Sequence, residues 1–222
     1  METKKKRISI LGDSVSTFAG YTPAGALFYD SWRQGETGVT SPDDTWWMQV
    51  IQGMGGVLGV NNSCAGSTVS GGLASSGTSE QRLQALGTEG DPDVILVAMG
   101  ANDWGFGVNP QEFEYEYRRM LQRLKRLYPK AELWCATLLR GRPVEEEEMF
   151  FNVESVLSPG IYSDIIRKIA LEERCHLADL AGYHAEYETI DGIHPNKEGM
   201  KMISCLWLKE LQKQQEEERR RI

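Results

Sequence analysis

Short apolar runs alternate along the chain with longer segments in which apolar residues recur every three or four positions. The runs have the length of β-strands, and the longer segments have the period of amphipathic helices. Strands and helices that alternate in this way are typical of βαβ units, whose crossover connections build a parallel sheet. The runs predict strands at residues 7–11, 57–61, 94–99, 133–138 and 177–180.

The run at residues 94–99 differs from the others because it is apolar at every position. A strand with one solvated face alternates apolar and polar residues, whereas a strand covered on both faces does not. We therefore expect this strand in the middle of the sheet.

Four segments carry apolar residues at helical period. In one of them Pro110 stands in the first turn and Pro129 follows the last, which is typical of helix boundaries. The predicted helices lie at 44–54, 110–128, 161–174 and from 197 to about 215. Residues 1–6 and about 216–222 carry no apolar stripe, so we expect both ends of the chain to fray.

The length of 222 residues fits one α/β domain, because a second independent core would have to be very small. Apolar residues make up 41% of the chain and charged residues 25%, which is ordinary globular usage. We therefore treat residues 1–222 as a single domain.

Two segments, 19–42 and 140–160, fit neither the strand pattern nor the helix pattern. Long irregular connections in a compact domain often carry function.

The formal net charge of -8 argues against a partner that is bound through its phosphates, so we expect no nucleic-acid binding. No stretch approaches the roughly 20 apolar residues of a membrane span. The apolar run that follows the basic start is also too short for a secretory signal. These features predict a cytoplasmic chain as written.

The sequence contains no pattern of metal ligands. The cysteines are widely spaced, so we expect buried, reduced thiols and no metal site. They are Cys64, Cys135, Cys175 and Cys205. The acidic run at 145–148 lacks interleaved ligand spacing and is interpreted as a solvated surface.

Gly12, Asp13 and Ser14 follow the first predicted strand directly. Ligands of open α/β sheets bind at the carboxyl ends of the strands. The Ser14 hydroxyl is therefore expected where a substrate would bind, although the tripeptide alone is more typical of an ordinary turn.

Asp191 and His194 stand three residues apart, with Gly192 between them. A tight turn at this point can bring the carboxylate onto one imidazole nitrogen and leave the other nitrogen to face a nucleophile. A serine hydroxyl needs such a base, because it is a poor nucleophile until its proton is removed. Taken alone, the segment is also compatible with a turn at a helix start that carries an exposed histidine.

Two further segments offer hydrogen-bond donors. Asn102 follows the central strand, and its amide N–H groups suit a site where negative charge develops on a carbonyl oxygen. Gly66 follows the second strand, and its backbone N–H can approach a ligand without side-chain obstruction. An asparagine that caps a turn is the alternative reading of the first segment.

These four segments lie at strand ends or just before the last helix, so they face the same edge of the sheet. In order, they resemble the four sequence blocks of the SGNH (GDSL-like) hydrolase family: Gly12-Asp13-Ser14, Gly66, Gly100-Ala101-Asn102-Asp103 and Asp191-Gly192-Ile193-His194. The resemblance implies a three-layer α/β/α, flavodoxin-like fold with an open parallel five-stranded sheet. It also implies hydrolysis of esters or thioesters without metal or cofactor.

Carried over by residue, the resemblance makes Ser14 the nucleophile, His194 the general base and Asp191 the group that orients His194. The backbone N–H groups of Ser14 and Gly66, together with the Asn102 side chain, would form the oxyanion hole. Val15 stands where the name-giving pattern has leucine, which leaves the subfamily open.

Other residues compete for roles. His176 and His184 are rival bases, and Asp13 is interpreted as structural or hydrogen-bonding because neighbouring side chains usually point apart. Several aromatic side chains in loops are expected at the rim of the site, where they would contact an acyl chain or a sugar, with plain loop packing as the alternative. They are Phe28, Tyr29, Trp32, Trp104 and Phe106.

The leading hypothesis is a serine esterase that acts on a small-molecule or carbohydrate ester, either by removing acetyl groups from a carbohydrate or by cleaving short acyl esters. A non-catalytic glycan-binding module on the same fold is an alternative from a different class. A thioesterase or lysophospholipase is the third possibility. The sequence makes no prediction of the oligomeric state.

Overall fold

A computed structural model describes residues 4–23, 26–144 and 158–221 of the chain. Its centre is a five-stranded parallel sheet with the strand order β2-β1-β3-β4-β6. The strands are β1 Arg7–Gly12, β2 Val57–Asn61, β3 Val94–Ala98, β4 Glu132–Ala136 and β6 His176–Ala178. All five predicted strands are present, and β3 is the central one, as its uninterrupted apolar sequence predicted.

All four predicted helices are also present, with boundaries that differ by a few residues. They are α2 Trp46–Gly53, α5 Pro110–Leu127, α6 Pro159–Glu172 and α7 Lys197–Arg221. Helix α7 continues beyond residue 215, where we expected it to end. The boundary was misplaced because charged residues without an apolar stripe can still propagate an existing helix.

Several short elements were not predicted, because none is long enough to show a period. They are the helices α1 Gln34–Thr37, α3 Glu80–Ala85 and α4 Ala101–Gly105, the 3₁₀ helices η1 Ser14–Ser16, η2 Pro42–Asp44 and η4 Leu180–Tyr183, and the paired strands β5 Arg140–Gly141 and β7 Glu186–Tyr187. The segments 19–42 and 140–160 therefore hold local structure where it is described.

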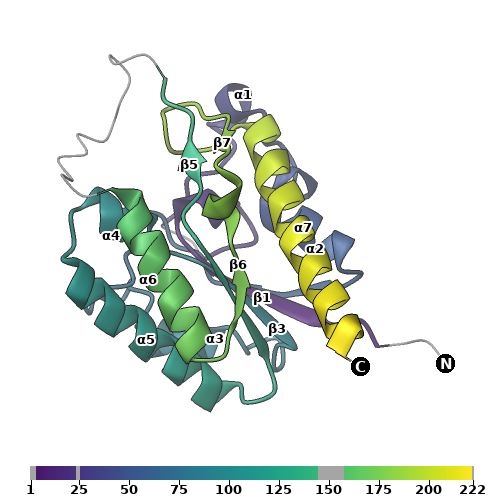
Figure 1. Cartoon of the computed structure of the whole chain (residues 1–222). Helices are drawn as coiled ribbons and strands as arrows, with labels where there is room; N and C mark the ends of the chain where they lie inside the picture. The colour runs from purple at the N-terminus through teal and green to yellow at the C-terminus, as the bar shows by residue number, and fades with distance from the viewer. Residues whose placement is uncertain (1–3, 24–25, 145–157, 222) are drawn as a thin grey trace.

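Helices cover both faces of the sheet, which confirms the three-layer α/β/α architecture (Figure 1). Helices α2 and α7 pack on one face, where Trp46 and Trp207 stack with ring centroids 5.4 Å apart. Helices α3, α5 and α6 pack on the other face. Successive residues of β3 alternate between the two cores, so this strand is buried on both sides.

The sequence of helix α5 determines where the helix begins and which face it buries. The Asn109 side chain accepts a hydrogen bond from the backbone N–H of Gln111, and Pro110 occupies the first turn. One face of the helix is fully buried, and burial of each large apolar side chain contributes about 1.5–3 kcal/mol. The buried residues are Phe113, Tyr117, Met120, Leu121 and Leu124.

All four cysteines are free, but only Cys135 is buried. The expectation of buried thiols is wrong for the exposed Cys205, which lies on α7. Within the described ranges, no helix is long and apolar enough to cross a bilayer, and no group of His, Cys, Asp and Glu side chains could hold a metal ion. The acidic run at 145–148 lies outside the described residues.

Candidate active site

Ser14, His194 and Asp191 lie in one hydrogen-bonded row at the carboxyl edge of the sheet. The distance between Ser14 Oγ and His194 Nε2 is 2.9 Å, and that between His194 Nδ1 and Asp191 Oδ2 is 2.6 Å. Ser14 and His194 are each 6% exposed. A hydroxyl, an imidazole and a carboxylate in this order are the arrangement in which a base removes the hydroxyl proton.

A compact turn holds the Asp191 carboxylate against its own backbone. Asp191 Oδ1 accepts hydrogen bonds from the backbone N–H groups of Ile193 and His194, at 3.0 and 2.7 Å. Gly192 has a φ of 86°, a conformation that favours glycine. Burial raises the pKa of Asp191, but the hydrogen bonds from His194 and Ile193 outweigh it and lower the pKa below its usual value. The carboxylate therefore stays ionised.

Phe28 and Tyr29 support the histidine from the segment before α1. The Phe28 ring stacks on the imidazole of His194, with centroids 3.4 Å apart and planes 9° from parallel. The Tyr29 hydroxyl donates to the backbone carbonyl of Pro195 at 2.8 Å, and the Tyr29 side chain is buried. Both aromatic residues contact the histidine segment, which fixes the orientation of the imidazole ring.

Asn102 lines the same cavity as Ser14, and Gly66 belongs to the segment after β2, in which the Cys64 N–H donates to the Gly12 carbonyl. Gly100, with a φ of 122°, ends the β3 segment and starts α4, which carries Asn102. Asn102 Nδ2 donates to the backbone carbonyl of Ser67 at 2.9 Å and so links α4 to the segment after β2. Gly66 has a φ of 73° and is exposed. Its backbone N–H donates to no acceptor in the described part of the chain.

Asp103 is hydrogen-bonded to the segment that follows β2 and carries Gly66. Its carboxylate accepts hydrogen bonds from the backbone N–H groups of Val69 and Ser70, at 2.8 and 3.0 Å. Burial raises the pKa of Asp103, and these hydrogen bonds oppose the increase. Asp103 therefore holds the chain near Gly66 and does not orient His194.

Arg82 is a buried cation that the sequence patterns did not single out. Its guanidinium donates to the backbone carbonyls of Gly12, Asn62 and Ser75, at 2.9, 2.6 and 2.5 Å. No salt bridge of Arg82 to a carboxylate is present among the described residues. Burial lowers the pKa of Arg82. The residue joins the ends of β1 and β2, the two segments that carry Ser14 and Gly66.

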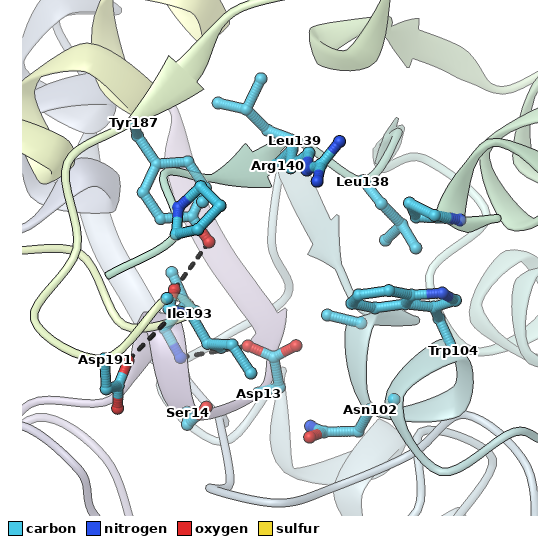
Figure 2. Close-up of a pocket in the computed structure, with 17 residues that line it drawn as sticks. Asp13, Ser14, Asn102, Trp104, Leu138, Leu139, Arg140, Tyr187, Asp191 and Ile193 are labelled. Carbon is cyan, nitrogen blue, oxygen red and sulfur yellow. Dashed lines mark hydrogen bonds between the residues drawn. The ribbon is translucent and has the colours of Figure 1, made fainter. Parts of the chain in front are cut away.

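A cavity of about 250 Å³ opens beside Ser14 (Figure 2). Most of its wall is apolar, with a few polar groups near the serine. The lining includes Asp13, Ser14, Val15, Asn102, Trp104, Leu138, Leu139, Arg140, Pro143, Tyr187, Asp191 and Ile193. An apolar cavity with convergent polar groups is the usual form of a small-molecule site.

The four sequence blocks thus meet at one edge of the sheet. Of the aromatic residues predicted at the rim, one lines the cavity and others do not. Trp104 lines the cavity. Tyr29 is buried behind the histidine, and Trp32 is 91% exposed, so the expectation that these two contact substrate in the cavity is not supported. Phe28 contacts the histidine ring and is not part of the cavity wall. The direction of a loop side chain depends on tertiary packing, which the sequence pattern does not contain.

The two rival histidines lie elsewhere. His176 belongs to β6 and stacks on Trp134, with ring centroids 4.7 Å apart. His184 is exposed in a left-handed conformation after η4. Neither lines the cavity beside Ser14.

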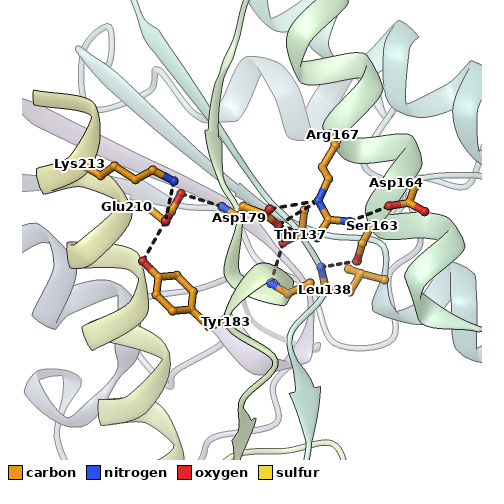
Figure 3. A network of polar contacts seen from close by, with 10 residues as sticks. Thr137, Leu138, Ser163, Asp164, Arg167, Asp179, Tyr183, Glu210 and Lys213 are labelled. Atoms are coloured by element: carbon orange, nitrogen blue, oxygen red, sulfur yellow. Dashed lines mark hydrogen bonds and ion pairs between the residues drawn. The ribbon is translucent and has the colours of Figure 1, made fainter. Parts of the chain in front are cut away.

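Asp179 belongs to a separate polar network between α6 and α7 (Figure 3). It accepts hydrogen bonds from Arg167 at 2.7 Å and from the hydroxyl of Thr137 at 3.0 Å. Burial raises the pKa of Asp179, but the Arg167 and Thr137 hydrogen bonds outweigh it and lower the pKa. The network fixes the loops after β4 and β6. Asp179 therefore does not orient His194, whose Nδ1 is paired with Asp191.

Sequence reasoning missed most of the apolar wall. Leu138 and Leu139 follow β4 at the carboxyl edge of the sheet, so the rule that located Ser14 and Asn102 also applies to them. Tyr187 lies in the two-residue strand β7, and no sequence signal marks so short an element.

Comparisons with known proteins agree with this geometry. Residues 6–211 match the family model described as GDSL-like Lipase/Acylhydrolase. The chain is 28% identical over 208 residues to thioesterase 1/protease 1/lysophospholipase L1 of Escherichia coli, which covers 91% of this chain and 82% of that protein.

Solved structures give the same result. A GDSL-like lipase from Bacteroides uniformis is 27% identical with a TM-score of 0.70, covering 92% of this chain and 94% of the other. A GDSL-like lipase from Bacteroides ovatus is 25% identical with a TM-score of 0.72, covering 95% and 100%. The chain therefore belongs to the GDSL-like lipase/acylhydrolase family of ester-cleaving hydrolases.

Proposed function

We propose that the protein is a serine esterase that cleaves carboxylic esters through an acyl-enzyme on Ser14. The observation that carries the proposal is the row from Ser14 Oγ to His194 Nε2 to Asp191, with distances of 2.9 and 2.6 Å. In this arrangement Nδ1–H of a neutral His194 donates to the ionised Asp191, and Nε2 accepts the hydroxyl proton.

In the first step Ser14 Oγ attacks the ester carbonyl carbon while His194 Nε2 takes the hydroxyl proton. The carbonyl oxygen gains negative charge, which the backbone N–H groups of Ser14 and Gly66 and the Asn102 amide stabilise. One N–H of that amide is held by the Ser67 carbonyl, which leaves the second to donate to the oxyanion.

Collapse of the tetrahedral intermediate breaks the bond to the alcohol oxygen, and His194 returns the proton to the departing alcohol. Water then enters, and His194 takes a proton from it as it attacks the acyl carbon. The second intermediate collapses, and the proton passes back to Ser14 Oγ. The products are a carboxylic acid and an alcohol.

The cavity size favours a small substrate, such as a short acyl ester or an acetylated carbohydrate. At about 250 Å³ the cavity is slightly smaller than typical ligand sites, which measure roughly 300–1,000 Å³. Its apolar side chains, among them Trp104, Leu138 and Ile193, suit an acyl chain.

Hydrolysis of p-nitrophenyl acetate and butyrate tests the proposal. Ser14→Ala and His194→Ala should each reduce kcat to near the background rate, and a fluorophosphonate should modify Ser14 and no other residue, as located by mass spectrometry. Ser79→Ala and His184→Asn are matched controls, because the Ser79 side chain makes no capping bond and His184 is exposed. Equal rates for all variants, or modification of another residue, would contradict the mechanism.

A thioesterase is a second candidate, favoured by the 28% identity to a protein whose name includes thioesterase and lysophospholipase. The same Ser14 chemistry serves a thioester. Comparison of kcat/KM for butyryl thioesters and butyryl oxygen esters separates the two activities. A non-catalytic glycan-binding module receives no support, because a binding role does not require a base at hydrogen-bond distance from a hydroxyl.

A further inference from the structure

Asp13 holds a carboxyl group inside the cavity, where the proposed reaction assigns it no role. It precedes Ser14 directly, yet both residues line the same cavity. Figure 2 shows the carboxyl group of Asp13 in the space between Ile193 and Trp104. The expectation that neighbouring side chains point apart fails here, because Asp13 and Ser14 lie where β1 turns into η1.

Only one of the two Asp13 carboxyl oxygens accepts a hydrogen bond from the described part of the chain. Oδ1 accepts a hydrogen bond from the backbone N–H of Val15 at 3.1 Å and so caps η1. Oδ2 accepts none within the described residues. The side chain is nevertheless buried, since Asp13 is 4% exposed. Oδ2 is not among the polar atoms that are sealed from solvent without a partner, because it opens to the cavity, where water or a donor group of a substrate can reach it.

The position of Asp13 lets a ligand reach this oxygen. A smaller cavity of about 80 Å³ adjoins the larger one, and Asp13 lines both. The other residues shared by the two cavities are mainly apolar, including Val15, Ala101 and Leu138. A substrate that extends from Ser14 toward the smaller cavity therefore passes one strong acceptor in apolar surroundings.

We propose that Asp13 is a specificity-determining residue, whose free carboxylate oxygen accepts a hydrogen bond from a hydroxyl group that the substrate carries close to the scissile ester. This inference rests on the proposed role of Ser14. The hydroxyl belongs either to the acyl part or to the alcohol part of the ester, since both are neighbours of the attacked carbonyl.

The charges around Asp13 favour a neutral donor over a cation. Arg82, and His194 once it is protonated, act on the Asp13 carboxylate as positive charges, and Asp103 acts in the opposite direction as the weakest of the three. His194 becomes an imidazolium during each proposed step, which adds positive charge next to the carboxylate. A cationic substrate group would be repelled by both, whereas a hydroxyl is not. Burial raises the pKa of Asp13 to about 6, so the group is mainly a carboxylate, and hence an acceptor, at pH 7.

Matched substrate pairs test the proposal. The acyl pair is p-nitrophenyl butyrate and p-nitrophenyl β-hydroxybutyrate, and the alcohol pair is propyl butyrate and glyceryl monobutyrate. For each pair, the readout is the ratio of kcat/KM for the hydroxylated ester to that for the plain ester. The wild type should prefer the hydroxylated ester in one pair, and the pair that responds identifies the part of the substrate that carries the hydroxyl.

Two variants then remove the acceptor. In Asp13→Asn the amide oxygen keeps the bond from the Val15 N–H, while the second oxygen becomes an N–H₂ donor. In Asp13→Ser the hydroxyl still caps η1, and the second oxygen is absent. The preference should fall roughly 10- to 100-fold in both variants, as is typical when a charged hydrogen bond to substrate is lost. An effect transmitted through His194 changes both esters of a pair equally and leaves the ratio constant.

The outcomes separate this proposal from the proposed function. Absence of hydrolysis and of fluorophosphonate labelling at Ser14 in the wild type would overturn both. Wild-type hydrolysis with no preference in either pair would overturn the Asp13 proposal alone, whether or not the variants fold. A preference that survives both substitutions, in variants that are still labelled at Ser14, would also overturn it.

Discussion

Burial of the Asp13 carboxyl predicts a pH-dependent effect of Asp13→Asn on stability. The pKa of Asp13 is raised to about 6 from a reference of 3.8, mainly because burial disfavours the charged form. The folded state therefore binds this proton more tightly than the unfolded state. Between the two pKa values the stability of the wild type falls as pH rises, because the folded protein must ionise a buried group.

The magnitude follows from the two pKa values. They differ by about 2, and each pKa unit corresponds to 1.36 kcal/mol. Asparagine keeps the bond to the Val15 N–H but carries no titrating proton. Between pH 4 and pH 7, the free energy of unfolding of Asp13→Asn should therefore rise by roughly 2 to 3 kcal/mol relative to that of the wild type.

Urea unfolding at pH 4 and pH 7, followed by tryptophan fluorescence, measures this difference. Asp91→Asn is the matched control, because Asp91 is exposed and its variant should track the wild type at both pH values. A stability difference between Asp13→Asn and the wild type that is the same at both pH values would show that burial does not perturb this carboxyl group. A difference that falls with rising pH would show a net stabilisation of the ionised form.

Three other substitutions test the remaining parts of the site. Asn102→Ala should lower kcat on p-nitrophenyl butyrate on the order of 100- to 1000-fold while leaving a measurable rate, because one oxyanion donor of several is lost. Asp191→Asn should lower kcat by up to about 10⁴-fold with little change in KM, because the amide no longer fixes the His194 tautomer. Arg82→Met should lower the free energy of unfolding by about 3 kcal/mol or more in urea titrations, because it removes three hydrogen bonds from a charged donor to backbone carbonyls, two of them buried. A full rate for Asn102→Ala or Asp191→Asn, or wild-type stability for Arg82→Met, would contradict the corresponding role.

The long elements were predictable because each buries a periodic apolar face against the sheet. Strand β3 and helix α5 have enough residues for the period to be unambiguous. The short helices α3 and α4 have no such pattern, since tertiary contacts stabilise them more than their own sequence does. Helix α4 is nevertheless essential to the site, because it presents Asn102 toward the Ser67 carbonyl.

The site residues were predictable to the extent that a topological rule applies to them. Ser14, Gly66 and Asn102 each follow a parallel strand, and the carboxyl ends of such strands meet at one edge. Arg82 follows no rule of this kind. It lies on α3, and its importance comes from three carbonyls that are distant in sequence. A buried arginine has no local signature, because its partners are backbone groups that any residue provides.

Asp13 shows how a local rule and the tertiary structure can disagree at a functional site. Strand alternation predicts that Asp13 and Ser14 face opposite ways, but β1 ends at Gly12, and the following 3₁₀ turn brings both side chains into one cavity. The same turn gives Asp13 its capping bond to Val15, which stabilises the conformation that exposes Ser14 Oγ to His194. The carboxyl group thus has one oxygen committed to the backbone of the nucleophile turn and one directed at the cavity. A substitution that keeps the first and changes the second, such as Asp13→Asn, separates the contribution of Asp13 to the fold from its contribution to substrate choice.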